Sequence, residues 1–249
     1  MIRTLLIITG AGLVLCIAAL SGAAVLGGND LARHGWEWTV RGGGEDRTIR
    51  FERRTPGPSV TRNLSWTGGD RLQISVPGDV VYIQGETPSV VVTGQESLVD
   101  RIRLIDGRLE YDADDNTRHV FFGWSDGDRL RITVTAPSVT RFDLESWADL
   151  TIRSYDQPTI HLNVQGSGDV DAAGETETAT IKISGSGDAD LSALRVADAA
   201  VDLSGSGDLM VGPSGAARID ISGSGDVELT RRPTNLQQSA SGSGEIRQN

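Results

Sequence analysis

The sequence predicts an all-β fold, a β-solenoid (β-helix) with about 19 residues per coil that follows an N-terminal transmembrane or signal helix. Three observations predict it. An uncharged apolar segment lies near the N-terminus, a glycine-rich acidic motif recurs through the last third of the chain, and apolar residues alternate with polar ones around each copy. A fixed period sustained over several copies is typical of proteins built from units that stack on one another.

The composition agrees with a turn-rich β protein. The 249 residues include 31 glycines, and 38% of the residues are hydrophobic. Each glycine in a helix interior costs about 1 kcal/mol relative to alanine, so a helical protein rarely carries so many. The formal net charge of -11 opposes binding to a phosphate backbone, so we expect no nucleic-acid partner.

Residues 1–28 are predicted to be a transmembrane anchor or a signal peptide. The stretch 5–26 carries no charge and is preceded by Arg3. A bilayer core takes about 20 apolar residues, whereas the apolar region of a signal peptide usually has about 7–15, so the length favours an uncleaved anchor in the membrane. Ser21 and Ala23 leave a cleaved signal open. We expect a cell-envelope protein, anchored in the inner membrane with its domain in the periplasm or outside, or secreted if the signal is cleaved.

Residues 29–60 are predicted to be a linker or tether, because glycine and proline clusters interrupt them. Trp36 and Trp38 have two interpretations. They suit the membrane–water interface, where amphipathic rings are favoured, and they equally suit an edge strand Trp-Glu-Trp-Thr-Val that covers the end of the domain.

The repeat has five copies. They occupy residues 161–172, 181–192, 201–212, 219–230 and 238–249. Their acidic positions are Asp169, Asp188, Asp208, Asp226 and Glu245. A degenerate copy at 142–153 places Asp149 at the same position one repeat earlier.

Within each copy, apolar residues alternate before and after the Gly-Ser-Gly-Asp motif, as at Ile219 and Ile221, then Val227 and Leu229. A period of two predicts strands with these side chains on one face. One unit is therefore strand, Gly-Ser-Gly-Asp corner, strand and a variable return segment. A β-α-β unit needs about 30 residues, so the short repeat favours one coil of a β-solenoid.

The upstream half has the same pattern of short strands separated by turn residues, but the spacing is less regular. Short strands are predicted around Gly78-Asp79 and in the segments 89–94, 101–113 and 128–139. Asp106-Gly107 is a strong two-residue hairpin signal. We therefore assign residues 61–249 to one β-solenoid domain, with irregular strands at 61–140, continuous with the regular repeats at 141–249.

The repeated corners are interpreted as structural. Glycines supply backbone angles that residues with a Cβ resist, and each acidic side chain accepts a backbone hydrogen bond in an Asx-type turn. These corner residues are Gly166, Gly168, Asp169, Gly185, Gly187, Asp188, Gly205, Gly207, Asp208, Gly223, Gly225, Asp226, Gly242, Gly244 and Glu245.

Metal binding or catalysis by the repeated corners is the weaker interpretation. Calcium candidates are Asp169, Asp188, Asp208 and Asp226, but a calcium ion takes six to eight oxygens and each coil offers one carboxylate. Three scattered histidines and one cysteine do not suggest a zinc set, and the spacing of a Gly-x-Ser-x-Gly nucleophile motif is missing. We predict no catalytic residue and no cofactor.

The segment 112–128 interrupts the pattern with Phe121, Phe122 and Trp124 among aspartates. Aromatic residues on a loop suit contact with a carbohydrate or a protein. They equally suit a hairpin that caps the open end of the solenoid core. If the domain has a binding loop, we expect it here.

The strand–Ser-Gly-Ser-Gly-Asp–strand repeats, preceded by the segment GDVVYIQGETPSVVVTG at 78–94, resemble the putative auto-transporter adhesin head (GIN) domain family. The resemblance runs from about Leu64 to the last residue. It implies a β-helical bacterial envelope protein with no established catalytic activity and no defined ligand residues. The sequence departs from the pattern at Glu245 and in the polar residues after it, which suggests a terminal cap.

The predicted function is therefore a non-enzymatic, adhesin-like or scaffolding domain whose partner is an envelope protein or a glycan. A carbohydrate-active β-helix enzyme and a calcium-binding repeat protein stay open as alternatives. A signalling ectodomain is a third class, disfavoured because four residues precede the apolar segment.

Overall fold

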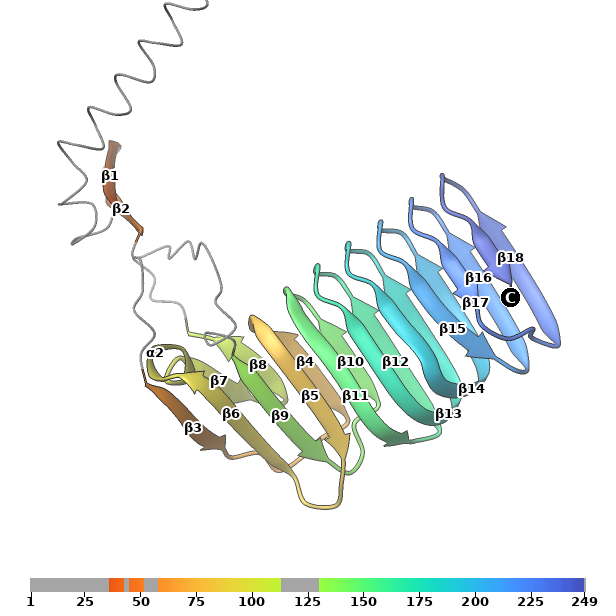
Figure 1. Cartoon of the computed structure of the whole chain (residues 1–249), viewed down its shortest axis with the longest axis horizontal. Coiled ribbons are helices and arrows are strands. Elements are labelled where there is room, and N and C mark those ends of the chain that lie inside the picture. Colours follow the sequence, from red (N-terminus) through yellow and green to blue (C-terminus); the bar gives the residue numbers. More distant parts are fainter. Residues whose placement is uncertain (1–35, 43–44, 52–57, 113–129, 249) are drawn as a thin grey trace, which may run out of the picture. The chain divides into compact units, whose positions relative to one another are not determined.

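The computed structural model describes residues 36–42, 45–51, 58–112 and 130–248 (Figure 1). The chain divides into two compact units: one contains a small hairpin, and the other contains all strands from β3 onward. The predicted transmembrane or signal segment, 5–26, lies outside the described residues. Among the residues that are described, no helix is long and apolar enough to cross a membrane.

The small hairpin consists of β1 (Trp36–Gly42) and β2 (Glu45–Phe51), which pair antiparallel from Trp36 opposite Phe51 to Gly42 opposite Glu45. It lies within the stretch predicted to be a tether. The edge-strand interpretation of Trp-Glu-Trp-Thr-Val is right about the strand itself. The glycine clusters around it did not indicate that the stretch also holds the partner strand β2.

The larger unit is a β-solenoid with two ladders of strands. The first ladder holds, in spatial order, β7 (Ile102–Ile105), β8 (Arg108–Tyr111), β4 (Arg71–Ser75), β10 (Arg141–Leu144), β12 (Thr159–Val164), the second part of β13 (Val170–Ile183), the second part of β14 (Ala189–Leu203), β16 (Ala216–Ile221) and β18 (Asn235–Ala240). The second ladder holds β3 (Ser59–Leu64), β6 (Ser89–Gln95), β9 (Arg131–Ala136), β5 (Gly78–Gln84), β11 (Ala148–Asp156), the first parts of β13 and β14, β15 (Leu209–Pro213), β17 (Val227–Leu229) and β19 (Ile246–Gln248).

The regular coils stack in parallel register, as the sequence predicts (Figure 1). Ile183 pairs with Leu203, and Leu203 pairs with Ile221, so inward side chains form continuous columns. These three residues are at most 2% exposed. Burying an aliphatic side chain contributes about 1.5–3 kcal/mol, and the repeated columns supply this in every coil.

The irregular strands continue the regular coils, because β10 pairs with β4 and β11 pairs with β5. Sequence order and spatial order differ here. β8 and β9 follow β4 and β5 along the chain but pair with their opposite edges, so the chain first lays down β4–β5 and then builds on both sides of it. The predicted hairpin at Asp106-Gly107 is confirmed, since β7 and β8 pair antiparallel and both turn residues have positive φ.

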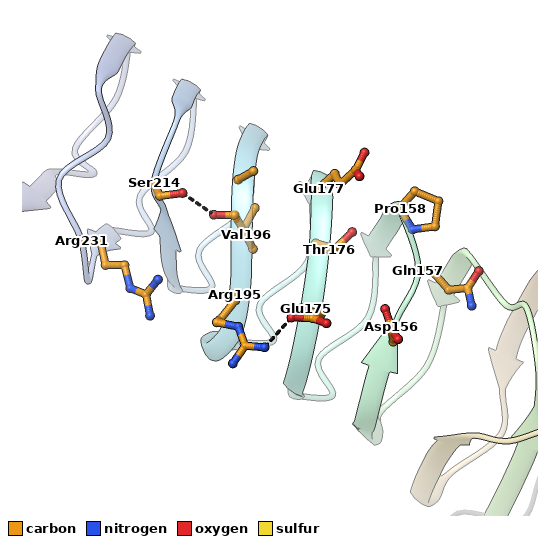
Figure 2. A pocket seen from close by; sticks show the side chains of 11 residues that line it. Asp156, Gln157, Pro158, Glu175, Thr176, Glu177, Arg195, Val196, Ser214 and Arg231 are labelled. Carbon is orange, nitrogen blue, oxygen red and sulfur yellow. Dashed lines mark hydrogen bonds and ion pairs between the residues drawn. The ribbon is translucent and has the colours of Figure 1, made fainter.

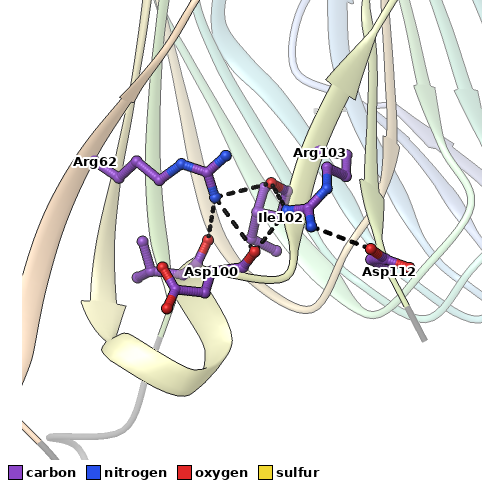
Figure 3. Close-up of polar contacts among 6 residues, drawn as sticks. Arg62, Asp100, Ile102, Arg103 and Asp112 are labelled. Atoms are coloured by element: carbon purple, nitrogen blue, oxygen red, sulfur yellow. Dashed lines mark hydrogen bonds and ion pairs between the residues drawn. The ribbon is translucent and has the colours of Figure 1, made fainter. Parts of the chain in front are cut away.

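Arg62 stabilises the end of the solenoid nearest β3 (Figure 3). It lies between Val60 and Leu64, which pack against the core, and its Nη1 donates to the carbonyls of Val99 (3.1 Å) and Asp100 (3.3 Å). Those carbonyls lie at the end of the short helix α2 (Glu96–Val99). An inward-pointing charge on an edge strand opposes pairing with another chain. The sequence did not predict this helix.

The last described coil carries polar residues at inward positions. Gln238 pairs with Ile219, and Gln248 pairs with Leu229, so glutamines replace core side chains of the preceding coil. Terminal repeats of solenoids are typically polar on their outer side. The arrangement agrees with the cap expected from the polar residues around Glu245.

Candidate functional site

The acidic corner residues form a column that we call the acid ladder: Asp149, Asp169, Asp188, Asp208, Asp226 and Glu245. Each aspartate Oδ1 accepts the backbone N–H of the acidic residue in the next coil, at 2.7–3.1 Å. A bond in the opposite direction completes each step; for example, the Ala189 N–H donates to the Asp208 carbonyl at 2.8 Å. The expected Asx-type turn is therefore wrong, because the carboxylate bonds to the next coil and not to its own turn.

The corner glycines are required by close stacking. A Cβ on Gly205 would lie 1.9 Å from the Gly185 carbonyl oxygen, and one on Gly207 would lie 2.0 Å from that of Gly187. Among the corner glycines, Gly242 alone has a left-handed φ, at 149°. The prediction that backbone angles demand glycine is therefore wrong at the other corners. The neighbouring coil occupies the space that a side chain would need.

Calcium binding at Asp169, Asp188, Asp208 and Asp226 stays a prediction. Their side chains stand one above another on successive coils, and one oxygen of each is already hydrogen-bonded to the backbone. Within the described part of the chain, His, Cys, Asp and Glu side chains form no group of three that could hold a metal ion.

The predicted binding loop lies outside the described residues, which omit 113–129 and with them Phe121, Phe122 and Trp124. Asp112, which precedes the gap, pairs with Arg103 at 3.1 Å (Figure 3). In the sequence, this segment stands between β8 and β9. Its role as a cap or a binding loop stays a prediction.

A groove of about 630 Å³ runs along the return segments, and we call it the return groove (Figure 2). Each of several successive coils contributes one short stretch to it. The lining residues are Asp156, Gln157, Pro158, Glu175, Thr176, Glu177, Arg195, Val196, Ala197, Ser214 and Arg231. These residues belong to no motif in the sequence, so the groove was not predicted.

The unequal lengths of the return segments explain where this groove lies. Successive acid-ladder residues are separated by 20, 19, 20, 18 and 19 residues. The strands of the first ladder keep their register, whereas register shifts follow Ile152, Asp171 and Leu191, at the start of the returns. The return side therefore absorbs the length differences and stacks less evenly. Unequal return lengths are visible in the sequence and could have indicated the groove.

The return groove carries charges of both signs. Asp156, Glu175 and Glu177 are on its acidic side, and Arg195 and Arg231 come from the following coils (Figure 2). Arg195 bonds to Glu175, and this hydrogen bond raises the pKa of Arg195 above its ordinary value, so the guanidinium stays charged. Within the described residues, Arg231 has no carboxylate partner. Such a surface suits polar, extended ligands more than an apolar molecule.

Comparison with protein families gives one match over most of the domain. The model of a family described as "Putative auto-transporter adhesin, head GIN domain" matches residues 70–233. No curated protein matches the chain.

Solved structures share the fold. A putative adhesin from Bacteroides fragilis is 18% identical, covers 77% of this chain and 97% of its own, and superposes with a TM-score of 0.64. A putative adhesin from Parabacteroides distasonis is 15% identical and covers 78% of this chain and 98% of its own, with a TM-score of 0.45. At 18% identity, the likeness to the Bacteroides fragilis structure supports the β-solenoid fold.

Proposed function

The chain belongs to the putative auto-transporter adhesin head GIN domain family, and from that membership we propose that it is a non-enzymatic bacterial cell-envelope protein with an adhesin-like or scaffolding role. The solenoid is displayed outside the inner membrane, either held there by residues 5–26 or secreted after their cleavage. Its partner is an envelope protein or a glycan.

The acid ladder is the observation that carries this proposal. Acidic residues outnumber basic ones in the repeats, and those at the corners bond one coil to the next. Catalytic carboxylates in glycosidases instead face each other across a bound sugar. The repeated acids therefore support a stiff solenoid whose outer faces are available for contact.

The return groove supports a role in binding. It extends across successive coils, so a ligand along it would be an extended chain, either a polypeptide segment or a glycan. Its charges of both signs favour specific polar contacts, which contribute to orientation and selectivity.

The first test separates binding from catalysis. The full chain, purified in a mild detergent, is incubated with isolated peptidoglycan sacculi and with a panel of acidic and neutral polysaccharides. We expect co-sedimentation with an envelope polymer and no new reducing ends or unsaturated products. Product formation would establish the carbohydrate-active enzyme instead, and calcium-dependent binding lost on chelation would support the calcium-repeat alternative.

The second test concerns location. In cells that produce the chain with a C-terminal tag, we expect the tag to lie outside the inner membrane, protected from protease only by an outer membrane or released to the medium. Retention in membranes after alkaline carbonate extraction would show that residues 5–26 anchor the chain, and a soluble product would show that they are cleaved. A tag that stays protected until the inner membrane is lysed would refute the proposed display.

A further inference from the structure

A two-by-three grid of polar side chains lies on the outer face of the first ladder, on β4, β10 and β12. Arg71 pairs in register with Arg141, which pairs with His161; two positions along, Gln73 pairs with Asp143, which pairs with Asn163. Paired strands are about 4.8 Å apart, so the first row brings two guanidinium groups and an imidazole close together. Figure 1 shows β8, β4, β10 and β12 in this succession.

The first row is costly without a ligand. Like charges directly opposite each other on neighbouring strands are destabilising. Arg71 is compensated by Asp143, at 2.8 Å from its Nε, but Arg141 has no carboxylate partner among the described residues. An uncompensated arginine beside another arginine is unexpected in a chain with a net charge of -11.

A hollow of about 380 Å³ adjoins the same row, and the Gln73 side chain lines it. Gln73 lines it together with Arg71 and Arg108, and Ile105, which is 53% exposed, lies at its rim. Gln73 is 6% exposed, and within the described part of the chain its side-chain amide makes no hydrogen bond. Arg108 also has no ion pair there. The Gln73 amide is therefore free to bond to a ligand in the hollow, with both a donor and an acceptor.

One buried atom of the grid has no hydrogen-bond partner among the described residues. Asn163 donates from Nδ2 to Asp143 Oδ1 at 3.0 Å, and its own Oδ1 is buried without a partner. The opposite amide orientation would place two oxygens against each other, so reorienting the side chain does not remove the problem.

We infer that this face, formed by β8, β4, β10 and β12, binds a carboxylate-bearing glycan, in which uronate carboxylates contact Arg71, Arg141 and His161 and sugar hydroxyls contact Gln73. Arginine binds a carboxylate through a planar pair of N–H donors, and a hydroxyl group can both donate to and accept from an amide. Glu110 and Asp106 also line the hollow, so the carboxylates of the ligand belong on the arginine row and its hydroxyls on the hollow side.

A glycan fits these observations better than a small anion does. The row of two arginines and one histidine extends over three strands, and the Gln73 amide lies to one side of it. The exposed Ile105 offers an apolar contact for the C–H face of a sugar ring. The inference goes beyond the proposed function by naming a site and a ligand class. It rests on that function only in treating outer faces of the solenoid as binding surfaces.

The test is calorimetric titration of the full chain, in mild detergent, with a short oligogalacturonate and with the fully methyl-esterified form of the same oligosaccharide. We expect the charged form to bind, the ester to bind at least about tenfold more weakly, and inorganic phosphate not to compete. Equal binding of both forms, no binding of the charged form, or displacement by phosphate would each overturn the inference.

Matched variants locate the site. Arg141→Gln and Gln73→Leu should each weaken binding of oligogalacturonate by about tenfold. Arg153→Gln removes the same charge from an exposed arginine on β11 and should leave binding unchanged. An equal loss in Arg141→Gln and Arg153→Gln would reduce the effect to net charge and refute the site. If oligogalacturonate does not bind and no polysaccharide is cleaved, this inference fails but the proposed adhesin-like function is unaffected. If a polysaccharide is cleaved, the proposed non-enzymatic function is refuted at any binding affinity.

Discussion

The first corner of the continuous stack differs from the regular corners above it. Residues 145–149 (Glu-Ser-Trp-Ala-Asp) take the place of Gln-Gly-Ser-Gly-Asp at 165–169, with the same length and the acidic residue at the same position. Ser146 and Ala148 carry Cβ atoms, and the Ser146 hydroxyl donates to the Val76 carbonyl at 2.7 Å. In the next coil, a Cβ on Gly166 would lie 1.7 Å from the backbone carbonyl oxygen of Ser146. Glycine is therefore a requirement of tight coil-on-coil stacking and not of the corner's shape.

The interiors of the two regions differ as well. In the coils of β5, β10 and β11, Tyr82 meets Phe142 edge to face at 5.0 Å between ring centroids, and Phe142 meets Tyr155 at 6.1 Å. The inward columns of the later coils are aliphatic. Large rings fill an interior that is bounded by irregular strands, whereas identical coils accept only side chains of similar size that repeat in register.

The largest expected effect comes from placing a Cβ in a regular corner. Gly207→Ala puts a methyl group 2.0 Å from the Gly187 oxygen, so the coils must separate locally and lose hydrogen bonds. We expect the free energy of unfolding to fall by about 3 kcal/mol, measured by chemical denaturation of the full chain.

Two controls sharpen this first comparison. Gly69→Ala places a Cβ in open space and should change stability by less than about 1 kcal/mol. Ala148→Gly converts the first corner toward the regular sequence and should cost about 1–2 kcal/mol, through the flexibility of the unfolded chain and the loss of a buried methyl group. A Gly207→Ala variant as stable as Gly69→Ala would show that the coils are not tightly stacked at the corner.

The aromatic region predicts a distinctive alkaline sensitivity. Burial raises the pKa of Tyr82 to about 12 and raises that of Tyr155 further above its ordinary range, where the nearby Tyr82 adds to the effect. The folded state therefore keeps protons that the unfolded state releases above about pH 10. Stability should be constant just below pH 10 and fall between pH 10 and 12, by about 1.4 kcal/mol per pH unit for each tyrosine.

Tyr82→Phe tests this assignment. The variant loses the hydrogen bond from the hydroxyl to the Ala136 carbonyl (2.9 Å), so it should be about 1 kcal/mol less stable at pH 8. Above pH 10, its unfolding free energy, followed by circular dichroism in denaturant, should fall about half as steeply as that of the parent chain. An unchanged slope would remove Tyr82 from the explanation.

Much of the solenoid could be predicted because its signals are local. Alternation at Ile219, Ile221, Val227 and Leu229 identifies strands and their inward face, and the repeat spacing gives the coil length. The partner of an Asp carboxylate could not be predicted, because it is supplied by a residue about 19 positions away. The same holds for the reversed spatial order of β4 and β8, and for the grid around Arg141, whose members meet only through strand pairing. Within a single sequence, spacing along the strand is visible and spacing across strands is not.

The smallest expected effect concerns the acid ladder, which is present in the regular corners and begins at Asp149 in the first. Asp208→Ala removes the acceptor of the Asp226 N–H, now at 2.7 Å, and should cost about 1 kcal/mol, since solvent replaces part of the lost bond. Asp208→Asn keeps a side-chain oxygen and should recover most of that loss. Asp171→Ala, at an exposed position on β13 where the side chain has no hydrogen bond or ion pair to the described residues, should be neutral. If Asp208→Asn were as destabilising as Asp208→Ala, the negative charge itself would be what the ladder requires. Because neighbouring carboxylates repel each other, the opposite result is expected: the ladder uses the oxygen as an acceptor and tolerates the charge.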